Sequence, residues 1–330
     1  MEVAIVGLPN AGKTSLFNFL SRNEAHTDIY PFTTIERNVG IWEIPDKRIE
    51  RLKQKFSPEI ITSSRIEIVD VAGLVKGASK GEGLGNRFLA SIRDCDLILH
   101  LLRDFKGDIP HVEGSVAPFR DKEVVEVELM LADSEIVERM LNKLKFSFEE
   151  SELERKKILR KIKEQIEKIE KPAITEEERK KLKGSGLISI KPFIYVVNVD
   201  EYKAEYNKED TVEINVSLEN ELKDIEEKDE MRKAYGFSHD PLDKLAEKVK
   251  EKLNLITFYT VKGKETRGYL VKSDTEIIEA VGKIHSDMAK GFIKAEVIHF
   301  EDVDKNISPL IAGKNYKVRD GDIITVKFRT

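Results

Sequence analysis

The sequence predicts an α/β fold that begins with a P-loop, and three features support this prediction. Short runs rich in valine and isoleucine alternate with helical segments, as the buried strands of a parallel sheet do. A glycine-rich phosphate-binding motif lies between the first such run and the first helix. A long charged helical segment later interrupts the alternation. We therefore expect a P-loop G domain with a mostly parallel sheet at 1–121 and 186–252, an inserted helical coiled-coil arm at 122–185, and a C-terminal α+β domain at 253–330.

The composition restricts the class of protein. The chain has 330 residues, a formal net charge of −5, 40% hydrophobic residues and 35% charged residues. Because the net charge is negative, contact with RNA would require a local basic patch. Cys95 is the only cysteine, so no disulfide can form within the chain. No apolar run reaches the ~20 residues of a membrane span, and no signal-peptide pattern is present. We expect a cytoplasmic protein without membrane contact, and we expect it to be monomeric.

Five apolar runs are the expected strands of the G-domain sheet. Most of them do not alternate with polar residues, which is typical of strands buried on both faces. The runs occupy residues 2–7, 65–71, 96–102, 192–199 and 212–217. Helices are expected to begin near Lys13, Arg87 and Asp240.

The inserted segment carries two apolar stripes with helical spacing. One stripe consists of Ile136, Met140, Leu144 and Phe148, and the other of Ile158, Ile162, Ile166 and Ile169. Lysine, glutamate and arginine occupy most positions between them. We interpret the segment as a protruding antiparallel helical pair. The alternative is a pair of solvated helices that lie flat on the domain.

The last part of the chain has a different pattern. Strands are expected at "LITFYTV" and "TRGYLV", on either side of a turn at Gly263. A single helix is expected at "DTEIIEAVGKIHSDMAKG", which starts with Asp and Thr and ends with Gly. Further strands are expected at "FIKAEVIHF", "NYKVRD" and "DIITVKF", with a turn at 320–322. These elements predict a separate small α+β domain.

The phosphate-binding motif is the stretch "GLPNAGKT", from Gly7 to Thr14. Its glycines allow backbone N–H groups to surround a phosphate, and the start of the following helix favours negative charge. Lys13 supplies a positive charge to the β- and γ-phosphates, and Thr14 supplies a hydroxyl to Mg²⁺. A chance match on a glycine turn would not explain why the motif lies between a strand and a helix. The nucleotide is therefore expected to contact Asn10, Ala11, Gly12, Lys13, Thr14 and Ser15.

Two further motifs are expected to complete the magnesium and γ-phosphate site. Asp70 ends the strand "RIEIVD" and can contact the metal, and Gly73 can donate its N–H to the γ-phosphate. Thr33 and Thr34 lie in "YPFTTIERN", where a first switch is expected, and we favour Thr34. The alternative for both motifs is an ordinary turn or loop. The predicted Mg²⁺ ligands are Thr14, Thr34 and Asp70.

Four segments of the sequence resemble the YchF family of Obg-related translation-factor GTPases. They are "GLPNAGKTSLFN", "YPFTTIERNVG", "DVAGLVKGASKGEGLGNRFL" and "KGFIKAEVIHFED", and the resemblance extends over almost the whole chain. The resemblance implies a cytosolic NTPase that associates with ribosomes. It also implies that 122–185 forms a coiled-coil arm, that 253–330 is similar to a TGS domain, and that both face a cleft suited to nucleic acid.

The residues at the base-binding position depart from the guanine-specific motif N-K-x-D. Here the sequence is "NVDE", from Asn198 to Glu201, so the lysine is absent and a longer glutamate replaces the aspartate. A site that fits guanine poorly should lose most of its discrimination against ATP, and the family resemblance also implies that ATP is accepted. We therefore expect ATP to bind at least as tightly as GTP. The residues expected around the base are Asn198, Val199, Glu201, Asn215, Val216 and Ser217.

The expected rate of hydrolysis is low. Ras-like enzymes have a glutamine after D-x-x-G, and this sequence has Leu74 instead, which cannot orient the attacking water. Asn10 resembles the asparagine of potassium-dependent relatives, in which a K⁺ ion bridges the phosphates, and His111 could approach the γ-phosphate if its loop folds inward. The alternatives are a structural turn asparagine and a surface histidine. The catalytic candidates are Asn10, Lys13, Gly73 and His111.

Basic residues in the arm and in the C-terminal domain are candidates for RNA contact. They are Arg155, Lys156, Lys157, Arg160, Lys161, Lys262, Lys264, Arg267, Lys272, Lys290 and Lys294. The alternative is that they form solvated faces balanced by glutamates. The sequence supports two functions: a ribosome-associated switch that slowly hydrolyses ATP or GTP, or a nucleotide-gated regulator that binds RNA or protein and in which hydrolysis is incidental. A metabolic kinase is a third and weaker candidate, because the sequence shows no site for an acceptor substrate.

Overall fold

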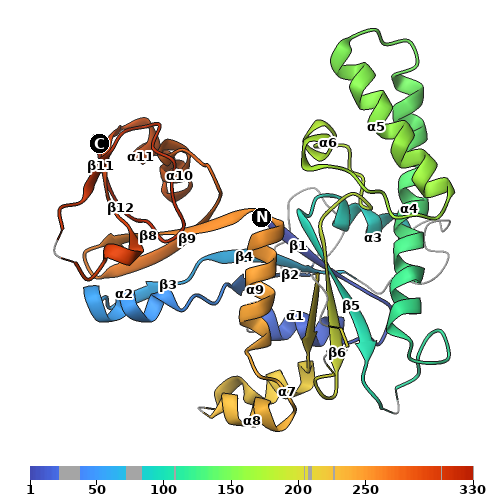
Figure 1. The fold of residues 1–330 in the computed structure, drawn as a ribbon, viewed down its shortest axis with the longest axis horizontal. Helices are drawn as coiled ribbons and strands as arrows, with labels where there is room; N and C mark the ends of the chain where they lie inside the picture. Colours follow the sequence, from blue (N-terminus) through green and yellow to red (C-terminus); the bar gives the residue numbers. More distant parts are fainter. Residues whose placement is uncertain are drawn as a thin grey trace. The chain divides into compact units, whose positions relative to one another are not determined.

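The structure, a computed structural model, divides the chain into two compact units (Figure 1). The first unit consists of Met1–Ile41 and Glu67–Pro241, and the second of Trp42–Ile66 and Leu242–Thr330. Within these units, the structure describes residues 1–21, 38–71, 84–107, 109–203, 205–206, 210–225, 227–305 and 307–329. Four residues singled out in the sequence lie outside the described residues: Thr33, Thr34, Gly73 and Leu74.

The first sheet has six strands in the order β2-β4-β1-β5-β6-β7. These strands are β1 (Glu2–Val6), β2 (Asn38–Glu43), β4 (Arg65–Asp70), β5 (Leu97–Asp104), β6 (Phe193–Val199) and β7 (Thr211–Ile214). β1 pairs in parallel with β4 and β5, and β6 pairs in parallel with β5 and β7. The side chains from Val3 to Val6 are fully buried, as expected for a central strand covered on both faces. The predicted α/β fold with a mostly parallel sheet is therefore confirmed.

Short helices connect the strands of the first unit. They are α1 (Lys13–Ser21), α3 (Leu84–Arg93), α7 (Val216–Glu221), the 3₁₀ helix Leu222–Asp224, and α8 (Lys228–Ala234). A further helix, α9 (Pro241–Lys252), leads into the second unit. The helix starts predicted near Lys13, Arg87 and Asp240 agree with α1, α3 and α9. The strand expected at 212–217 ends early, because the side chain of Asn215 caps α7 instead of continuing β7.

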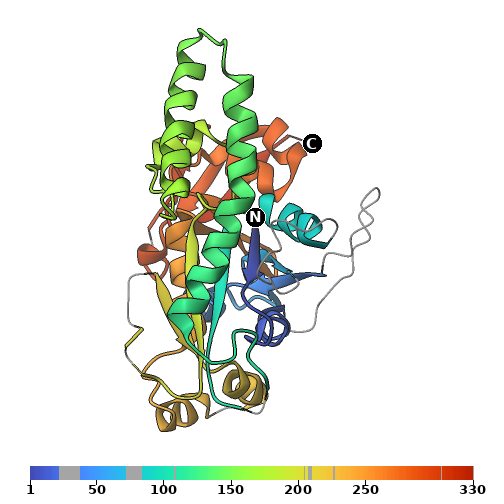
Figure 2. The same cartoon turned by 90° about the vertical axis from the view of Figure 1, so that its right-hand side faces the viewer.

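The inserted arm consists of α4 (Pro118–Lys143) and α5 (Glu150–Glu167), followed by the short helix α6 (Glu176–Lys181). α4 and α5 run side by side and extend past the sheet of the first unit (Figures 1 and 2). Val137, Leu159 and Ile162 belong to one apolar cluster between the two helices. The predicted stripes were too long, because Phe148 lies in the turn between α4 and α5 and Ile169 lies beyond α5, and both side chains are exposed.

The second unit contains a mixed six-stranded sheet in the order β11-β10-β12-β8-β9-β3. These strands are β3 (Ile60–Thr62), β8 (Leu255–Lys262), β9 (Glu265–Lys272), β10 (Phe292–Ile298), β11 (Leu310–Ala312) and β12 (Ile323–Phe328). β8 and β9 form an antiparallel hairpin that turns at Gly263, which has φ +60°, as the sequence predicts. β12 pairs in parallel with β8 and antiparallel with β10, so the domain is α+β as expected.

The helices of the second unit correct two predictions. They are α2 (Arg48–Phe56), α10 (Ile277–Ile284), α11 (Ser286–Lys290) and the 3₁₀ helix Phe300–Asp302. The single helix expected over 274–291 is wrong, because the extended backbone of His285 separates α10 from α11. The strand expected at 315–320 is also wrong. The carbonyl oxygen of Tyr316 accepts from the N–H of Ile277, and the N–H of Val318 donates to the carbonyl oxygen of Thr275. This segment therefore bonds to the residues around the start of α10 and not to a strand.

The segment 42–66 packs with the C-terminal part of the chain. Leu52 of α2 lies in an apolar cluster with Tyr259, Val303 and Ile323. β3 pairs in parallel with β9, so this segment also supplies an edge strand to the second sheet. The boundaries predicted from the sequence placed the segment in the first domain, because the local pattern of an amphipathic helix does not reveal which surface the helix will cover.

Candidate nucleotide-binding site

Two glycines shape the loop between β1 and α1. Gly7 has φ +154°, and a Cβ atom there would lie 2.4 Å from the carbonyl oxygen of Leu101 in β5. Gly12 has φ +96°, and a Cβ atom there would lie 2.7 Å from Nδ2 of Asn198 in β6. A side chain at Gly7 would have to move the backbone of β5, and a side chain at Gly12 would have to displace the amide of Asn198. The loop therefore lies directly against β5 and β6.

Lys13 begins α1 and turns its side chain into the loop. Its Nζ donates to the carbonyl oxygen of Leu8 at 2.9 Å, and the side chain is buried. Burial lowers the pKa of Lys13 to about 8, whereas the negative charge of Asp70 acts in the opposite direction. A buried ammonium group is costly without an anion, and the start of a helix also favours an anion. The surroundings of Lys13 therefore suit a phosphate group.

Thr14 and Asp70 place two oxygen ligands next to each other. Thr14 lies in the first turn of α1, Asp70 ends β4, and Oγ1 of Thr14 donates to Oδ2 of Asp70 at 3.1 Å. Burial raises the pKa of Asp70, although Thr14 and Lys13 act to lower it. Hydroxyl and carboxylate oxygens are ligands that Mg²⁺ prefers. These two residues fit the predicted metal site, and the third predicted ligand, Thr34, lies outside the described residues.

Asn198 joins the phosphate loop to the base side of the site. Its Nδ2 donates to the carbonyl oxygen of Ala11 at 3.2 Å, and its Oδ1 accepts from the N–H of Val216 at 3.1 Å. The side chain is buried, so both amide ends are held by backbone groups. Asn198 thereby fixes the loop relative to the start of α7. The sequence predicted only a contact between this residue and the base.

Asn215 has a second structural role on the base side. Its Oδ1 accepts from the N–H of Leu218 at 2.9 Å and caps α7, while its Nδ2 donates to the carbonyl oxygen of Asp200 at 2.6 Å. The Asp200 carboxylate in turn accepts from the N–H of Lys106 at 2.9 Å. These bonds connect the ends of β5 and β6 to α7. Asn215 thus positions the turn in which Glu201 lies.

The remaining predicted contacts differ in their exposure. The side chains of Val199 and Val216 are buried, and those of Glu201 and Ser217 are exposed. On the phosphate side, Ala11 is buried, while Thr14 and Ser15 are exposed. The structure brings these residues to the same end of the parallel sheet, where ligands bind in open α/β folds. Of the side chains predicted near the base, Glu201 and Ser217 are the exposed ones.

Asn10 connects the phosphate loop to the loop that precedes the arm. Its backbone is left-handed, with φ +64°, a conformation that asparagine tolerates better than most residues. Its Nδ2 donates to the carbonyl oxygen of Pro110 at 3.1 Å. The structure therefore supports the role of a turn asparagine. The contact with K⁺ stays a prediction.

His111 lies in the interior, and the expected alternative of a surface histidine is wrong. Its side chain is only 4% exposed, and Nε2 lies 2.8 Å from Oδ2 of Asp121 in α4. Nδ1 accepts from the N–H of Glu113 at 3.1 Å, so Nε2 carries the hydrogen and faces the carboxylate. His111 would have to leave Asp121 before its ring could act on a phosphate.

Sequence reasoning missed the partner of His111. Asp121 lies in the first turn of α4, just after Pro118, and accepts from Arg120 at 2.7 Å. Proline followed by an acidic residue is a common pattern at a helix start, and an acidic residue there is favoured by the helix dipole. This pattern could have located the start of α4, but not the contact with His111.

Comparisons with known proteins agree with this site. A family model described as 50S ribosome-binding GTPase matches residues 2–198, and a model named for the C-terminal domain of YchF GTPases, whose function is described as unknown, matches residues 255–329. A protein of Bacillus subtilis (strain 168), named ribosome-binding ATPase YchF, is 38% identical over 363 residues and is aligned over 99% of both chains. The chain belongs to the YchF family. YchF membership therefore extends over both units of the chain.

Further members of the YchF family are similar over the same length. The ribosome-binding ATPase YchF of Escherichia coli O157:H7 is 35% identical over 358 residues, which cover 99% of both chains. The solved structure of the Schizosaccharomyces pombe YchF GTPase has a TM-score of 0.81 and 30% identity, and the match covers 99% of this chain and 97% of that one. Within the described residues, no helix has both the length and the apolar character needed to cross a membrane.

Proposed function

We propose that this YchF protein is a ribosome-associated nucleoside triphosphatase that binds ATP at least as tightly as GTP and hydrolyses its substrate slowly. The observation that carries the proposal is the phosphate end of the site, where Lys13 is buried beside the pair of Thr14 and Asp70. The name of the relatives, ribosome-binding ATPase YchF, and the description of the matching family model, 50S ribosome-binding GTPase, support the association with ribosomes.

Each part of the site has a distinct task in this proposal. The backbone N–H groups of the loop and the ammonium group of Lys13 hold the triphosphate. Thr14, Asp70 and Thr34 would hold Mg²⁺, which when bound neutralises charge on the β- and γ-phosphates. The N–H of Gly73 would meet the γ-phosphate. These tasks require no side chain that recognises a particular base.

The base side of the site supports the acceptance of ATP. The position that carries lysine in guanine-specific enzymes is occupied by Val199. Its side chain is short and buried, so it cannot lie over a base ring as the lysine does. Asn198 and Asn215 bond to backbone groups, which leaves Glu201 and Ser217 as the exposed side chains predicted near the base. Without a fitted set of partners for guanine, discrimination between the two nucleotides should be small.

Slow hydrolysis is supported by Leu74, which replaces the water-orienting glutamine, and by the contact that keeps His111 on Asp121. Two measurements test this part. Replacing Leu74 with glutamine should raise the rate, and a rate that is the same in K⁺ and Na⁺ would remove the potassium role of Asn10. Either result leaves the proposal of nucleotide binding intact.

The alternative function is a nucleotide-gated regulator that binds RNA or protein. RNA contact through the arm and the C-terminal domain is less favoured, because several of the candidate lysines have acidic partners: Lys161 with Glu178, Lys264 with Glu59, and Lys290 with Asp287. Phosphate-dominated RNA binding would weaken steeply with salt, so filter binding to ribosomal RNA across a salt series tests this contact.

Hydrolysis in the presence of ribosomal subunits separates the two functions. The proposed switch predicts that subunits raise the rate of ATP hydrolysis, and the Lys13→Ala variant should show no such rise. If subunits bind the protein and leave the rate unchanged, hydrolysis is incidental and the regulator is favoured. Light scattering of the same sample tests the proposed monomeric state.

A further inference from the structure

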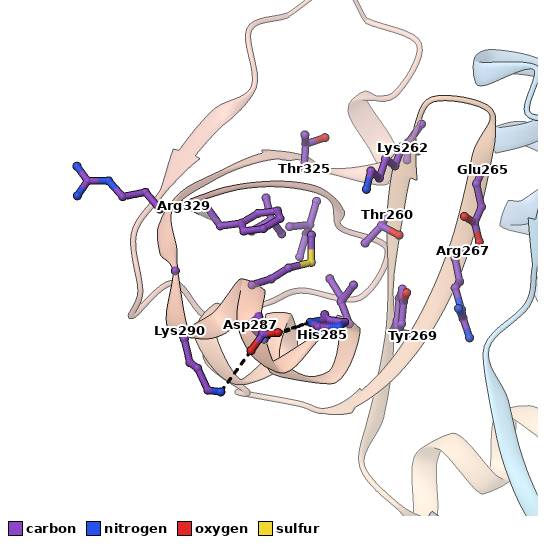
Figure 3. A pocket seen from close by; sticks show the side chains of 17 residues that line it. Thr260, Lys262, Glu265, Arg267, Tyr269, His285, Asp287, Lys290, Thr325 and Arg329 are labelled. Atoms are coloured by element: carbon purple, nitrogen blue, oxygen red, sulfur yellow. Dashed lines mark hydrogen bonds and ion pairs between the residues drawn. The ribbon is translucent and has the colours of Figure 1, made fainter.

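The second unit contains a large cavity that is separate from the nucleotide site. It has a volume of about 980 Å³ and lies between the β8–β9 hairpin, the junction of α10 and α11, and the end of β12 (Figure 3). α10 packs on one face of the sheet, where Phe258, Val271 and Ile324 are buried in the core with Ile277 and Val281. The cavity lies beside this core, and residues of α10 and α11 form part of its lining.

The floor and wall of the cavity are mainly apolar. Val326 and Phe328 come from β12, Tyr269 comes from β9, and Ile284 and Met288 come from α10 and α11. All five side chains are only partly buried, which leaves apolar surface in contact with water. Burying such surface is favourable by roughly 25 cal/mol per Å². A partner that covers this surface with apolar side chains would therefore gain favourable binding free energy.

Basic side chains surround this apolar floor. Lys262 and Arg267 lie on the side of the β8–β9 hairpin, and Lys290 and Arg329 lie on the opposite side (Figure 3). Two acidic residues also line the cavity. One of them, Asp287, already contacts Lys290 at 3.3 Å and His285 at 3.7 Å, as the dashed lines in Figure 3 mark. The rim thus carries four cationic side chains against two carboxylates, Asp287 and Glu265.

We propose that this cavity binds an acidic amphipathic peptide segment of a protein partner. The apolar side chains of the segment would enter between Met288 and Phe328, and its aspartates and glutamates would face Lys262 and Arg267. Apolar anchors in a groove combined with acidic residues against a basic rim form a common mode of peptide recognition. The site is independent of the nucleotide site and of the proposed hydrolysis.

A strand of RNA fits this cavity less well. Proteins that bind single-stranded nucleic acid stack its bases on open aromatic faces. Here the Tyr269 ring stacks on Phe258, with 5.2 Å between the centroids, and the guanidinium carbon of Arg267 lies 5.4 Å from the Tyr269 centroid. The Tyr269 ring already has protein neighbours, and the apolar floor also contains Ile284, Met288 and Val326, which offer no ring for a base to stack on. The charges of the rim would attract either partner, but the floor favours apolar side chains.

Selection of peptides from a random 12-residue phage library on the full-length protein tests the proposal. We expect selected peptides to combine leucine, isoleucine or phenylalanine with aspartate or glutamate. One selected peptide is then labelled and titrated by fluorescence anisotropy against the protein and three variants. The double variant Lys262→Glu/Arg267→Glu and the variant Met288→Glu should each weaken binding at least tenfold. Lys294→Glu, an exposed lysine outside the cavity, should weaken it less than twofold.

Four outcomes would overturn the proposal. They are the selection of no common pattern, the selection of basic peptides, an acidic peptide whose affinity is unaffected by both cavity variants, and binding of RNA in the cavity instead of the peptide. A single-stranded RNA 12-mer is titrated in parallel, and RNA binding that Met288→Glu abolishes would assign the cavity to RNA instead. Because Lys262 and Arg267 are exposed, the double variant should fold, and circular dichroism checks this for each variant.

Discussion

The two ends of the nucleotide site are built in different ways. At the phosphate end, the Lys13 side chain points into the loop and the Thr14 hydroxyl points toward Asp70, as their motif predicts. At the base end, the amides of Asn198 and Asn215 bond to backbone groups. A motif residue can therefore serve the scaffold as well as the ligand. Phosphate binding depends mainly on the path of the backbone, and base selection depends on the few side chains that remain exposed.

The two ends also differ in the groups that surround them. At the base end, the buried polar side chains predicted near the base are asparagine amides, which do not change charge with pH, and the carboxylate of Glu201 is exposed to water. The phosphate end lies beside a buried histidine, His100, which is opposite Val6 in the sheet. Acid should therefore disturb the phosphate end first. The following predictions test this comparison, from the largest expected effect to the smallest.

The largest effect is expected for Lys13→Ala. The ammonium group is buried at the start of α1 and would contact the phosphates of both nucleotides, so its loss should weaken the binding of ATP and of GTP to the same extent. Charge-assisted bonds of this kind contribute roughly 1.5–3 kcal/mol, which corresponds to a loss of affinity of about 10- to 150-fold. Isothermal titration measures both affinities. Lys143→Ala, an exposed lysine in α4, is the matched control, and equal affinities for the two variants would refute the role of Lys13.

The next effect is expected for Asn198→Ala, which should act on stability. The change leaves the carbonyl of Ala11 and the N–H of Val216 without their bonds in the interior, and we expect unfolding to become easier by about 2 kcal/mol. Urea denaturation measures the change. The control is Asn220→Ala in α7, since Asn220 is exposed and donates a single bond to Val216, and it should cost much less. Similar losses for both variants would contradict the scaffold role of Asn198.

A smaller effect is expected when His100→Leu is compared with the native protein in acid. Burial, together with the positive charges of Lys171, Lys122 and Lys13, lowers the pKa of His100 to about 3, while Glu126 acts to raise it. Between pH 6.5 and 3 the unfolded chain therefore binds a proton that the folded chain does not. Stability should fall as the pH decreases through this range, with His100 contributing up to about 1.4 kcal/mol per pH unit.

Urea denaturation at pH 6.5, 5.5 and 4.5 measures this slope. His100→Leu should lose less stability than the native protein over this range, because leucine has a similar size and does not titrate. The ring nitrogens of His100 have no hydrogen-bond partner among the described residues, so the substitution should remove no bond that stabilises the fold. Equal slopes for the two proteins would show that His100 does not cause the acid sensitivity.

The smallest effect is expected for Glu201→Ala. Glu201 is exposed, so its removal should leave the free energy of unfolding within about 0.5 kcal/mol of the native value. The ratio of ATP to GTP affinity should change by less than about tenfold, since one exposed hydrogen bond contributes roughly 0.5–1.5 kcal/mol. Competition binding with the two nucleotides measures the ratio. A larger change would place Glu201 at the centre of base recognition and would contradict the contrast between the two ends.

These contrasts also explain how far the sequence predicted the structure. The phosphate loop, the helix at Lys13 and the end of β4 at Asp70 follow from local patterns, because glycine spacing and apolar runs specify them directly. The strand expected at 212–217 failed because one side chain, Asn215, caps a helix there. Its effect depends on hydrogen bonds that apolar periodicity does not contain.

Contacts between distant segments were harder to predict. The contact of His111 with Asp121 joins a loop to a helix start, and nothing in either local pattern indicates the other. Sequence reasoning also missed α2, whose residue Leu52 packs in one cluster with Tyr259 of a distant segment. Sequence patterns therefore described elements well and their neighbours poorly. The base side was difficult for the same reason, since its residues come from β6 and the start of α7.

The most direct test of this account is a paired titration of the native protein with labelled ATP and GTP in the presence of Mg²⁺. The base end lacks a fitted set of partners for guanine, whereas the phosphate end would contact both nucleotides in the same way. The dissociation constant for ATP should therefore be equal to or lower than that for GTP. Tight binding of GTP with no measurable binding of ATP would contradict the account.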